Sequence, residues 1–176
     1  MILTGPQIAE EVDRGRVKIS PFTPAQITTN SYDLRLGRKY LTYDDEVLDP
    51  RRPPSCAEHA IPDEGIVLKG GEFILAETEE RIGGDHFVPL VHGKSSTARS
   101  GLFVHVTADL IDIGSYGKST LQLFATIPVK LYPGMLIAQV TFWVPKGDIV
   151  LYTGKYQNSD GPRPSLTYLD CRAVDA

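Results

Sequence analysis

The most polar segment of the chain lies between two short apolar runs and has the sequence HGKSSTARSG, residues His92–Gly101. It contains two cations, Lys94 and Arg99, and three hydroxyls between them, on Ser95, Ser96 and Thr97. Ala98 separates Thr97 from Arg99. A guanidinium offers paired planar donors, an ammonium is a point charge, and hydroxyls with loop N–H groups complete a cradle for an oxyanion. The spacing of a Walker loop is missing. The segment therefore predicts phosphate binding, and a solvated surface loop is the alternative.

A carboxylate follows in the segment ADLIDIGSYG, residues 108–117. Asp112 comes after an apolar pair and before a glycine turn, which suits a carboxylate held at the end of a strand. Such a group can bind a sugar hydroxyl or orient a water molecule. The alternative is an aspartate that only caps the turn.

A third polar position lies inside the run TLQLF, residues 120–124. Alternation along a strand puts Thr120, Gln122 and Phe124 on one face, and Leu121 and Leu123 on the other. A glutamine buried in such a strand needs partners for its amide. The spacing alone favours a structural hydrogen bond for Gln122 over a role in chemistry.

The other chemistry-bearing residues form no recognisable metal or redox site. The four histidines share no metal-ligand spacing, so no metal bound by protein side chains is expected. Cys56 and Cys171 are the only cysteines, too few for a disulfide framework within the chain, and neither has a catalytic partner near it in the sequence.

The elements that must position these groups are mostly strands. A capping box at Thr4 and Gln7, with Pro6 in the first turn, predicts a helix over residues 5–14. A strand is expected at Tyr32–Leu36, ended by Gly37, and an irregular proline-rich loop at residues 49–62. Further short strands are expected at residues 65–68, 72–76, 87–91, 102–107, 119–125, 128–131 and 135–144, and the tail 155–176 is expected to be an extended arm.

Size and charge narrow the function further. The 176 residues predict one domain, 1–176, and 18 Lys+Arg against 22 Asp+Glu give a net charge of −4. An acidic chain argues against a nucleic-acid partner or an anionic membrane surface. With no apolar run near the roughly 20 residues of a membrane span and no basic, apolar leader, we expect a cytoplasmic protein.

Six segments in this order resemble the dCTP deaminase family and its relatives, the trimeric dUTPases. They are NSYDLRLG (30–37), GKSSTARSGLFVHVTA (93–108), the ID-x-G turn at Asp112, TLQLF (120–124), PVKLYPGMLIAQ (128–139) and GKYQNSDGPRPS (154–165). The resemblance implies a mainly β, distorted β-barrel or jelly-roll-like fold of the dUTPase type. It also implies a homotrimer with active sites at subunit interfaces, and Mg²⁺ bound through the nucleotide triphosphate.

The resemblance also assigns residues. It places Lys94, Ser95, Ser96 and Arg99 on the triphosphate and catalytic loop, and Ala108 and Asp112 on the nucleoside-binding turn. Gln139 matches a nucleotide contact. The remaining matches are Tyr152, Lys155 and Tyr156 in the arm that closes over the phosphates, and Thr97, Ala98, Thr120, Leu121 and Gln122 along the same substrate site.

One position departs from the family pattern. Gln122 stands where the family has the glutamate that acts as general base in a zinc-independent attack of water at C4 of cytosine. A carboxamide has no useful basicity near neutral pH, and losing a proton-transfer group costs about 10²–10⁴-fold in rate. The amide is nearly isosteric with the acid and should still bind a pyrimidine. Two explanations stay open: a deliberate Glu→Gln change, or a natural loss of deamination.

Three functions follow as hypotheses. The first is a dCTP deaminase-type hydrolase that converts dCTP and water to dUTP and ammonia, with or without a second step to dUMP and diphosphate, impaired by Gln122. The second is a dUTP diphosphatase in which Asp112 orients the water. The third is a non-catalytic regulator that binds pyrimidine deoxynucleotides. dTTP is a candidate inhibitor in this family.

Overall fold

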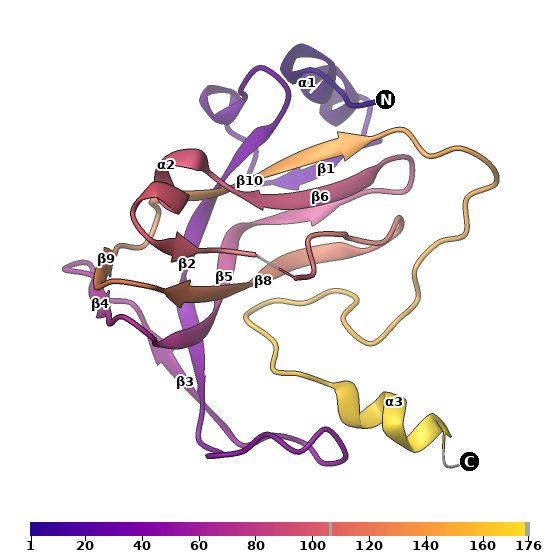
Figure 1. Ribbon diagram of the computed structural model, residues 1–176. Helices are drawn as coiled ribbons and strands as arrows, with labels where there is room; N and C mark the ends of the chain where they lie inside the picture. Colours follow the sequence, from indigo (N-terminus) through magenta and orange to yellow (C-terminus); the bar gives the residue numbers. More distant parts are fainter. Residues whose placement is uncertain (106, 175–176) are drawn as a thin grey trace.

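One large antiparallel sheet curls around a single apolar core in the computed structural model, which describes residues 1–105 and 107–174 (Figure 1). Its strands run in the order β6-β10-β2-β5-β8-β7, with β1 added beside β5 and β3 beside β2. Their bounds are β1 Lys18–Ser20, β2 Tyr32–Tyr43, β3 Cys56–Ala60, β5 Phe73–Gly83, β6 Val88–Gly93, β7 Leu102–Phe103, β8 Tyr116–Ala125 and β10 Leu136–Trp143. A separate pair consists of β4 (Ile66–Leu68) and β9 (Val129–Leu131).

The edge strand β6 forms hydrogen bonds with residues 109–111, and these bonds nearly close the sheet into a barrel. The amide of Val91 donates to the carbonyl of Asp109 at 2.9 Å, and that of Ile111 donates to Pro89 at 3.0 Å. Residues 109–111 belong to the segment that joins β7 to β8, the strands at the other end of the sheet, so the two ends of the sheet are linked through this stretch. The sequence prediction of a mainly β, barrel-like fold is confirmed.

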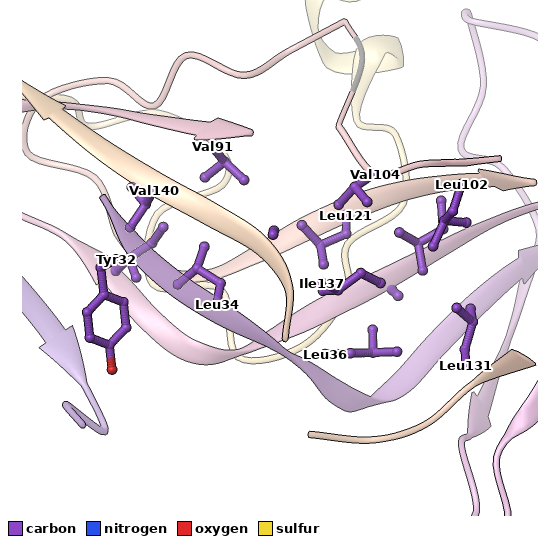
Figure 2. Close-up of a cluster of buried hydrophobic side chains, with 14 of the residues drawn as sticks. Tyr32, Leu34, Leu36, Val91, Leu102, Val104, Leu121, Leu131, Ile137 and Val140 are labelled. Atoms are coloured by element: carbon purple, nitrogen blue, oxygen red, sulfur yellow. The ribbon is translucent and has the colours of Figure 1, made fainter. Parts of the chain in front are cut away.

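The core confirms the alternation predicted for β8. Leu121 and Leu123 are fully buried, whereas Gln122 is partly exposed and Phe124 is exposed on the opposite face. Each buried leucine contributes about 1.5–3 kcal/mol relative to an exposed one. Figure 2 shows Leu121 in a cluster with side chains of neighbouring strands, among them Leu34, Leu36, Val91, Ile137 and Val140, and Leu123 belongs to the same core.

The N-terminal helix is present, but its predicted cap is wrong. Helix α1 spans Gly5–Asp13 with Pro6 in its first turn. Thr4 occupies the N-cap position without a side-chain hydrogen bond, so no capping box forms. The Gln7 side chain instead donates to Glu11 one turn later, at 2.9 Å.

The prediction that the strand from Tyr32 ends at Gly37 is also wrong, because β2 continues through this glycine to Tyr43. A Cβ at position 37 would lie 2.5 Å from Cγ of Glu77 on β5. Gly37 is therefore required by the close approach of a buried side chain from the neighbouring strand, and the register between β2 and β5 shifts across it, between Leu36 and Tyr40.

Several other boundaries differ from the sequence predictions. Strand β3 lies inside the segment predicted as an irregular loop, β5 is longer than expected, and β1 was not predicted. Strand β7 ends at Phe103, and Val106 of the predicted strand 102–107 lies outside the described residues. Two short helices replace predicted loop and arm: α2 at Ser95–Arg99 and α3 at Thr167–Val174.

The C-terminal arm leaves the end of β10, folds back beside β8 and ends in α3 (Figure 1). Its root is held by the N-terminus: the amide of Leu3 donates to Phe142 and that of Val144 donates to Met1, both at 2.9 Å. No helix in the described part of the chain has the length and apolar character that a membrane crossing requires.

Candidate active site

A cavity of about 450 Å³ lies between β8, the segment 108–115 that precedes it, and the C-terminal arm. Its size suits a small-molecule ligand. Apolar side chains line part of it, including Leu75, Ile82 and Ile111. Polar groups converge on the rest: Tyr43, His105, Asp112, Ser115, Lys118, Ser119, Thr120, Gln122, Tyr152, Tyr156, Ser159, Arg163 and Ser165.

Two glycines let the arm lie directly against the barrel. A Cβ on Gly114 would lie 2.9 Å from the amide nitrogen of Tyr152, and one on Gly117 would lie 2.8 Å from that of Ser159. Backbone hydrogen bonds form at these approaches, from Tyr152 to Ile113 at 2.8 Å and from Lys118 to Ser159 at 2.9 Å. The arm therefore forms one wall of the cavity of its own chain.

Two polar atoms buried at the cavity have no hydrogen-bond partner among the described residues: Oε1 of Gln122 and Nδ1 of His105. The other end of the Gln122 amide is 3.5 Å from the carbonyl of Thr120, at the limit of a hydrogen bond. Buried polar groups are normally paired. These atoms are consequently suited to a ligand with polar edges.

Burial shifts the proton affinity of two side chains of the cavity. It lowers the pKa of His105, and the nearby Ala108 backbone opposes this shift without cancelling it, so the neutral ring is favoured. It raises the pKa of Tyr43, whose hydroxyl accepts a hydrogen bond from the amide of Ser165 at 3.0 Å. Both side chains are therefore uncharged near neutral pH.

The structure brings six of the sequence-predicted site residues together around this cavity. They are Ala108, Asp112, Thr120, Gln122, Tyr152 and Tyr156. Asp112 is exposed, and its backbone carbonyl accepts the turn hydrogen bond from Ser115. The Leu121 side chain is buried in the core on the other face of β8, so its prediction can concern only the backbone. Lys155 lies in the arm and forms an ion pair with Asp170 of α3.

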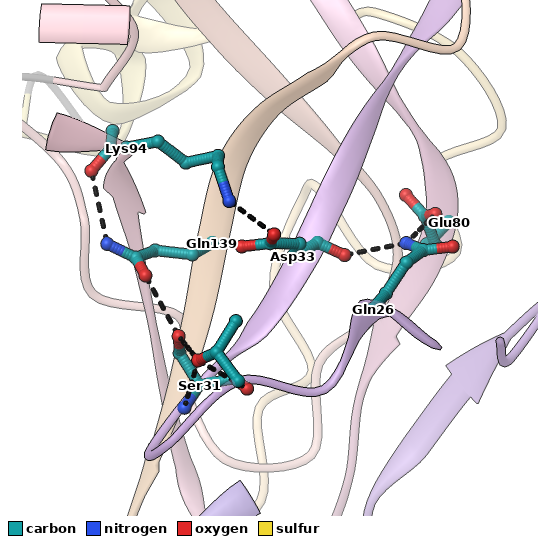
Figure 3. A network of polar contacts seen from close by, with 8 residues as sticks. Gln26, Ser31, Asp33, Glu80, Lys94 and Gln139 are labelled. Carbon is teal, nitrogen blue, oxygen red and sulfur yellow. Dashed lines mark hydrogen bonds and ion pairs between the residues drawn. The ribbon is translucent and has the colours of Figure 1, made fainter. Parts of the chain in front are cut away.

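The other predicted residues do not line the cavity of this chain. Ser95, Ser96, Ala98 and Arg99 are exposed on α2, while Thr97 is buried beneath it. Lys94, just before α2, forms an ion pair with the buried Asp33, whose second oxygen has no hydrogen-bond partner within residues 1–105 and 107–174. Gln139 accepts from Ser31 at 2.8 Å and donates to the Gly93 carbonyl at 3.3 Å (Figure 3).

Several cavity residues were not predicted from the sequence: Tyr43, Lys118, Arg163 and Ser165. Tyr43 and Lys118 carry no motif of their own and reach the cavity through the pairing of the strands. Arg163 and Ser165 stand in GPRPS, where the two prolines are a sequence signal for a rigid, extended segment.

The described residues hold no group of three or more His, Cys, Asp and Glu side chains that could bind a metal ion. Asp112 is the one carboxylate among the residues that line the cavity. A single carboxylate fits a Mg²⁺ ion whose other ligands come from a nucleotide, since Mg²⁺ in such sites keeps water and phosphate ligands.

Comparison with known proteins decides the family. A family model described as "dCTP deaminase-like" matches residues 2–144. This chain belongs to the dCTP deaminase-like family. The "dCTP deaminase, dUMP-forming" of Clostridium acetobutylicum is 43% identical over 171 residues, which cover 97% of this chain and 98% of the relative. The protein of the same name from Cytophaga hutchinsonii is 39% identical over the same share of each chain.

A solved structure supports the fold of this dCTP deaminase-like chain. The 2′-deoxycytidine 5′-triphosphate deaminase of Agrobacterium tumefaciens matches 82% of the chain with a TM-score of 0.66 and 22% identity. The match spans 48% of the length of that deaminase. At this identity the likeness concerns the fold alone, and it agrees with the barrel described above.

Proposed function

We propose that this dCTP deaminase-like chain is a hydrolase of pyrimidine deoxynucleoside triphosphates of the dCTP deaminase type, and that Gln122 limits its deamination of dCTP. The observation that carries the proposal is the position of Gln122. It lies in the wall of the cavity, and its buried Oε1 has no partner in the described part of the chain. A carboxylate at this position could take a proton from water, whereas the amide can only donate or accept hydrogen bonds.

The cavity supports a ligand of this class. Its apolar side chains can pack against the faces of a pyrimidine, and the amide of Gln122 can hydrogen-bond a polar edge of the base. The exposed carboxylate of Asp112 suits a sugar hydroxyl or a water molecule. Mg²⁺ carried by the triphosphate would screen the repulsion between the phosphates and Asp112.

Within one chain, the predicted site residues on α2 lie apart from those that line the cavity. This separation supports a site shared between subunits. The cations and hydroxyls of α2 are exposed and lie outside this chain's own cavity. In a homotrimer, α2 of one subunit would supply Ser95 and Arg99 to the cavity of the next. Such a shared site would contain both the predicted residues of α2 and those of the cavity.

The test of the deaminase proposal is Gln122→Glu. Ammonia release from dCTP should rise by about 10²–10⁴-fold, the usual contribution of a general base. Gln122→Met is the matched control, because it keeps the length of the side chain without a proton-transfer group, and it should give no rise. A Gln122→Glu chain that is folded, binds dCTP and releases no more ammonia than the unchanged protein would overturn the proposal.

A second candidate function is dUTP diphosphatase activity, in which Asp112 orients the attacking water. Two observations favour it: Asp112 lies at the cavity independently of Gln122, and curated relatives are named dUMP-forming. Diphosphate release from dUTP should then persist with Gln122 and disappear in Asp112→Asn. A chain that binds dUTP without releasing diphosphate would instead support the third hypothesis, a nucleotide-binding regulator.

A further inference from the structure

The positive charges around the cavity differ in whether a carboxylate neutralises them. Nζ of Lys118 lies 3.2 Å from Oε2 of the buried Glu77. Just outside the cavity, Arg81 pairs with Asp160 of the arm at 2.6 Å, and Lys155 pairs with Asp170. These three cations are therefore already compensated within the chain.

Arg163 is different. It lines the cavity and is exposed, and its guanidinium has no ion-pair partner among residues 1–105 and 107–174. Asp112 is the other formal charge in the cavity wall without a partner of opposite sign in the described part of the chain. Arg163 is consequently the principal uncompensated positive charge of the cavity.

The arm holds the backbone of Arg163 in a defined place. Its amide donates to Oγ1 of Thr120 on β8 at 2.9 Å, and two residues later the amide of Ser165 donates to the Tyr43 hydroxyl. Pro162 and Pro164 flank it and restrict the backbone on both sides. Little backbone entropy remains to be lost when the side chain binds a ligand.

We propose that Arg163 is a phosphate-binding residue that the arm supplies to the cavity of its own chain. The inference rests on the proposed function, in which this cavity binds a nucleoside triphosphate, and it names the group that holds the phosphates on the arm side. A guanidinium suits this task because its planar donors match two phosphate oxygens at once. Arg163 also balances the negative charge that Asp112 and the triphosphate bring to the same cavity.

The experiment compares ligands that differ only in phosphates. Titration calorimetry would measure the binding of α,β-imido-dUTP, dUMP and deoxyuridine to the full chain and to Arg163→Ala. A lost charge-assisted hydrogen bond predicts a loss of about 10- to 100-fold in affinity for the imido-triphosphate. Binding of deoxyuridine should change less than about twofold. Arg163→Lys should fall between, because it keeps the charge without the paired donors.

Arg51→Ala is the matched control. It removes the same charge from an exposed arginine in the β2–β3 loop, outside the cavity, and should leave all three affinities unchanged. Equal affinity for the imido-triphosphate in the unchanged chain and Arg163→Ala would overturn this inference and leave the proposed function intact. An equal loss for deoxyuridine would overturn it as well, since Arg163 would then support the cavity and not the phosphates. Failure of the unchanged chain to bind any of the ligands would overturn the proposed function together with the inference.

Discussion

Around the cavity, main-chain hydrogen bonds join the arm to the barrel, whereas beside α2 the side chains of Lys94 and Gln139 depend on individual polar contacts. The arm contacts Ile113 and Lys118 through backbone groups and lies against two glycines. On the α2 side, Lys94 depends on Asp33, and Gln139 joins Ser31 to the Gly93 carbonyl. Apart from Gly114 and Gly117, substitutions on the cavity side leave these main-chain hydrogen bonds in place, while single substitutions at Lys94 or Gln139 leave buried polar groups unpaired.

The two halves of the predicted site, which are the cavity and the exposed surface of α2, also differ in how far one chain encloses them. The cavity is enclosed by elements of one chain, but α2 presents Ser95 and Arg99 to solvent. The comparison teaches that the residues which the resemblance assigns to one site lie on two separate surfaces of a single chain. The predictions below test this separation.

The largest effect is expected from mixing two defective variants. Arg99→Ala damages only the α2 half and Asp112→Asn only the cavity half, so each alone should lose diphosphate release from dUTP. In mixed trimers that share sites between subunits, about a quarter of the sites would combine two intact halves. Co-refolded mixtures should regain roughly that share of activity; a mixture as inactive as its parents would place both halves in one chain's site.

Lys94→Met should have the largest effect on stability. It leaves the Asp33 carboxylate buried without its ion-pair partner, at a cost of about 2–3 kcal/mol in the free energy of unfolding, less than for a fully buried pair because Lys94 is partly exposed. Urea denaturation measures it. The double variant Asp33→Asn/Lys94→Met should recover most of the loss, and Asp112→Asn on the exposed cavity rim should cost less than about 0.5 kcal/mol.

Tyr43→Phe should weaken the docking of the arm without unfolding the barrel. It removes the acceptor for the Ser165 amide, one hydrogen bond worth about 1 kcal/mol. Hydrogen exchange at Ser165 should accelerate by about fivefold, while exchange in the buried strands stays unchanged. Unchanged exchange at Ser165 would mean that the other arm contacts hold this segment by themselves.

The smallest effect concerns His105 and pH. Burial lowers its pKa in the folded chain, so the unfolded chain binds a proton more readily. This contribution to stability is complete above the unfolded pKa of about 6.5 and is lost as pH falls below it. His105→Gln should therefore show a flatter dependence of the unfolding free energy between pH 7 and 5, and a parallel dependence would assign the pH effect to other groups.

Strand composition and alternation predicted a chain made mostly of strands and the two faces of β8, because burial on one face gives a period of two in TLQLF. The barrel itself was predicted from the family resemblance. Gly37 could not be interpreted correctly from sequence. Its absent side chain makes room for Glu77, which is 40 residues away in the chain. Likewise, the five residues of α2 form a helix despite a composition rich in hydroxyls, which local patterns assign to loops.

For the candidate site, the resemblance supplied the residues on β8 and in the arm that the structure gathers at the cavity. It could not supply Arg163, whose position depends on where the arm docks. It also could not show that Lys94 is held by Asp33, because that ion pair depends on the pairing of β6, β10 and β2. Local sequence patterns do not contain contacts between elements far apart in the chain, and these contacts are what the prediction of the site lacked.

The exposed segment between Val144 and Tyr152, the first two points at which the arm is fixed to the barrel, offers a site for limited proteolysis. Val144 is tied to the N-terminus and Tyr152 to Ile113, and residues 146–151 between them are exposed, with a lysine at position 146. A single tryptic nick after Lys146 would divide the protein into two fragments joined only by noncovalent contacts. Their rate of separation in size-exclusion chromatography, with and without nucleotide, would then measure how tightly the C-terminal arm binds to the barrel.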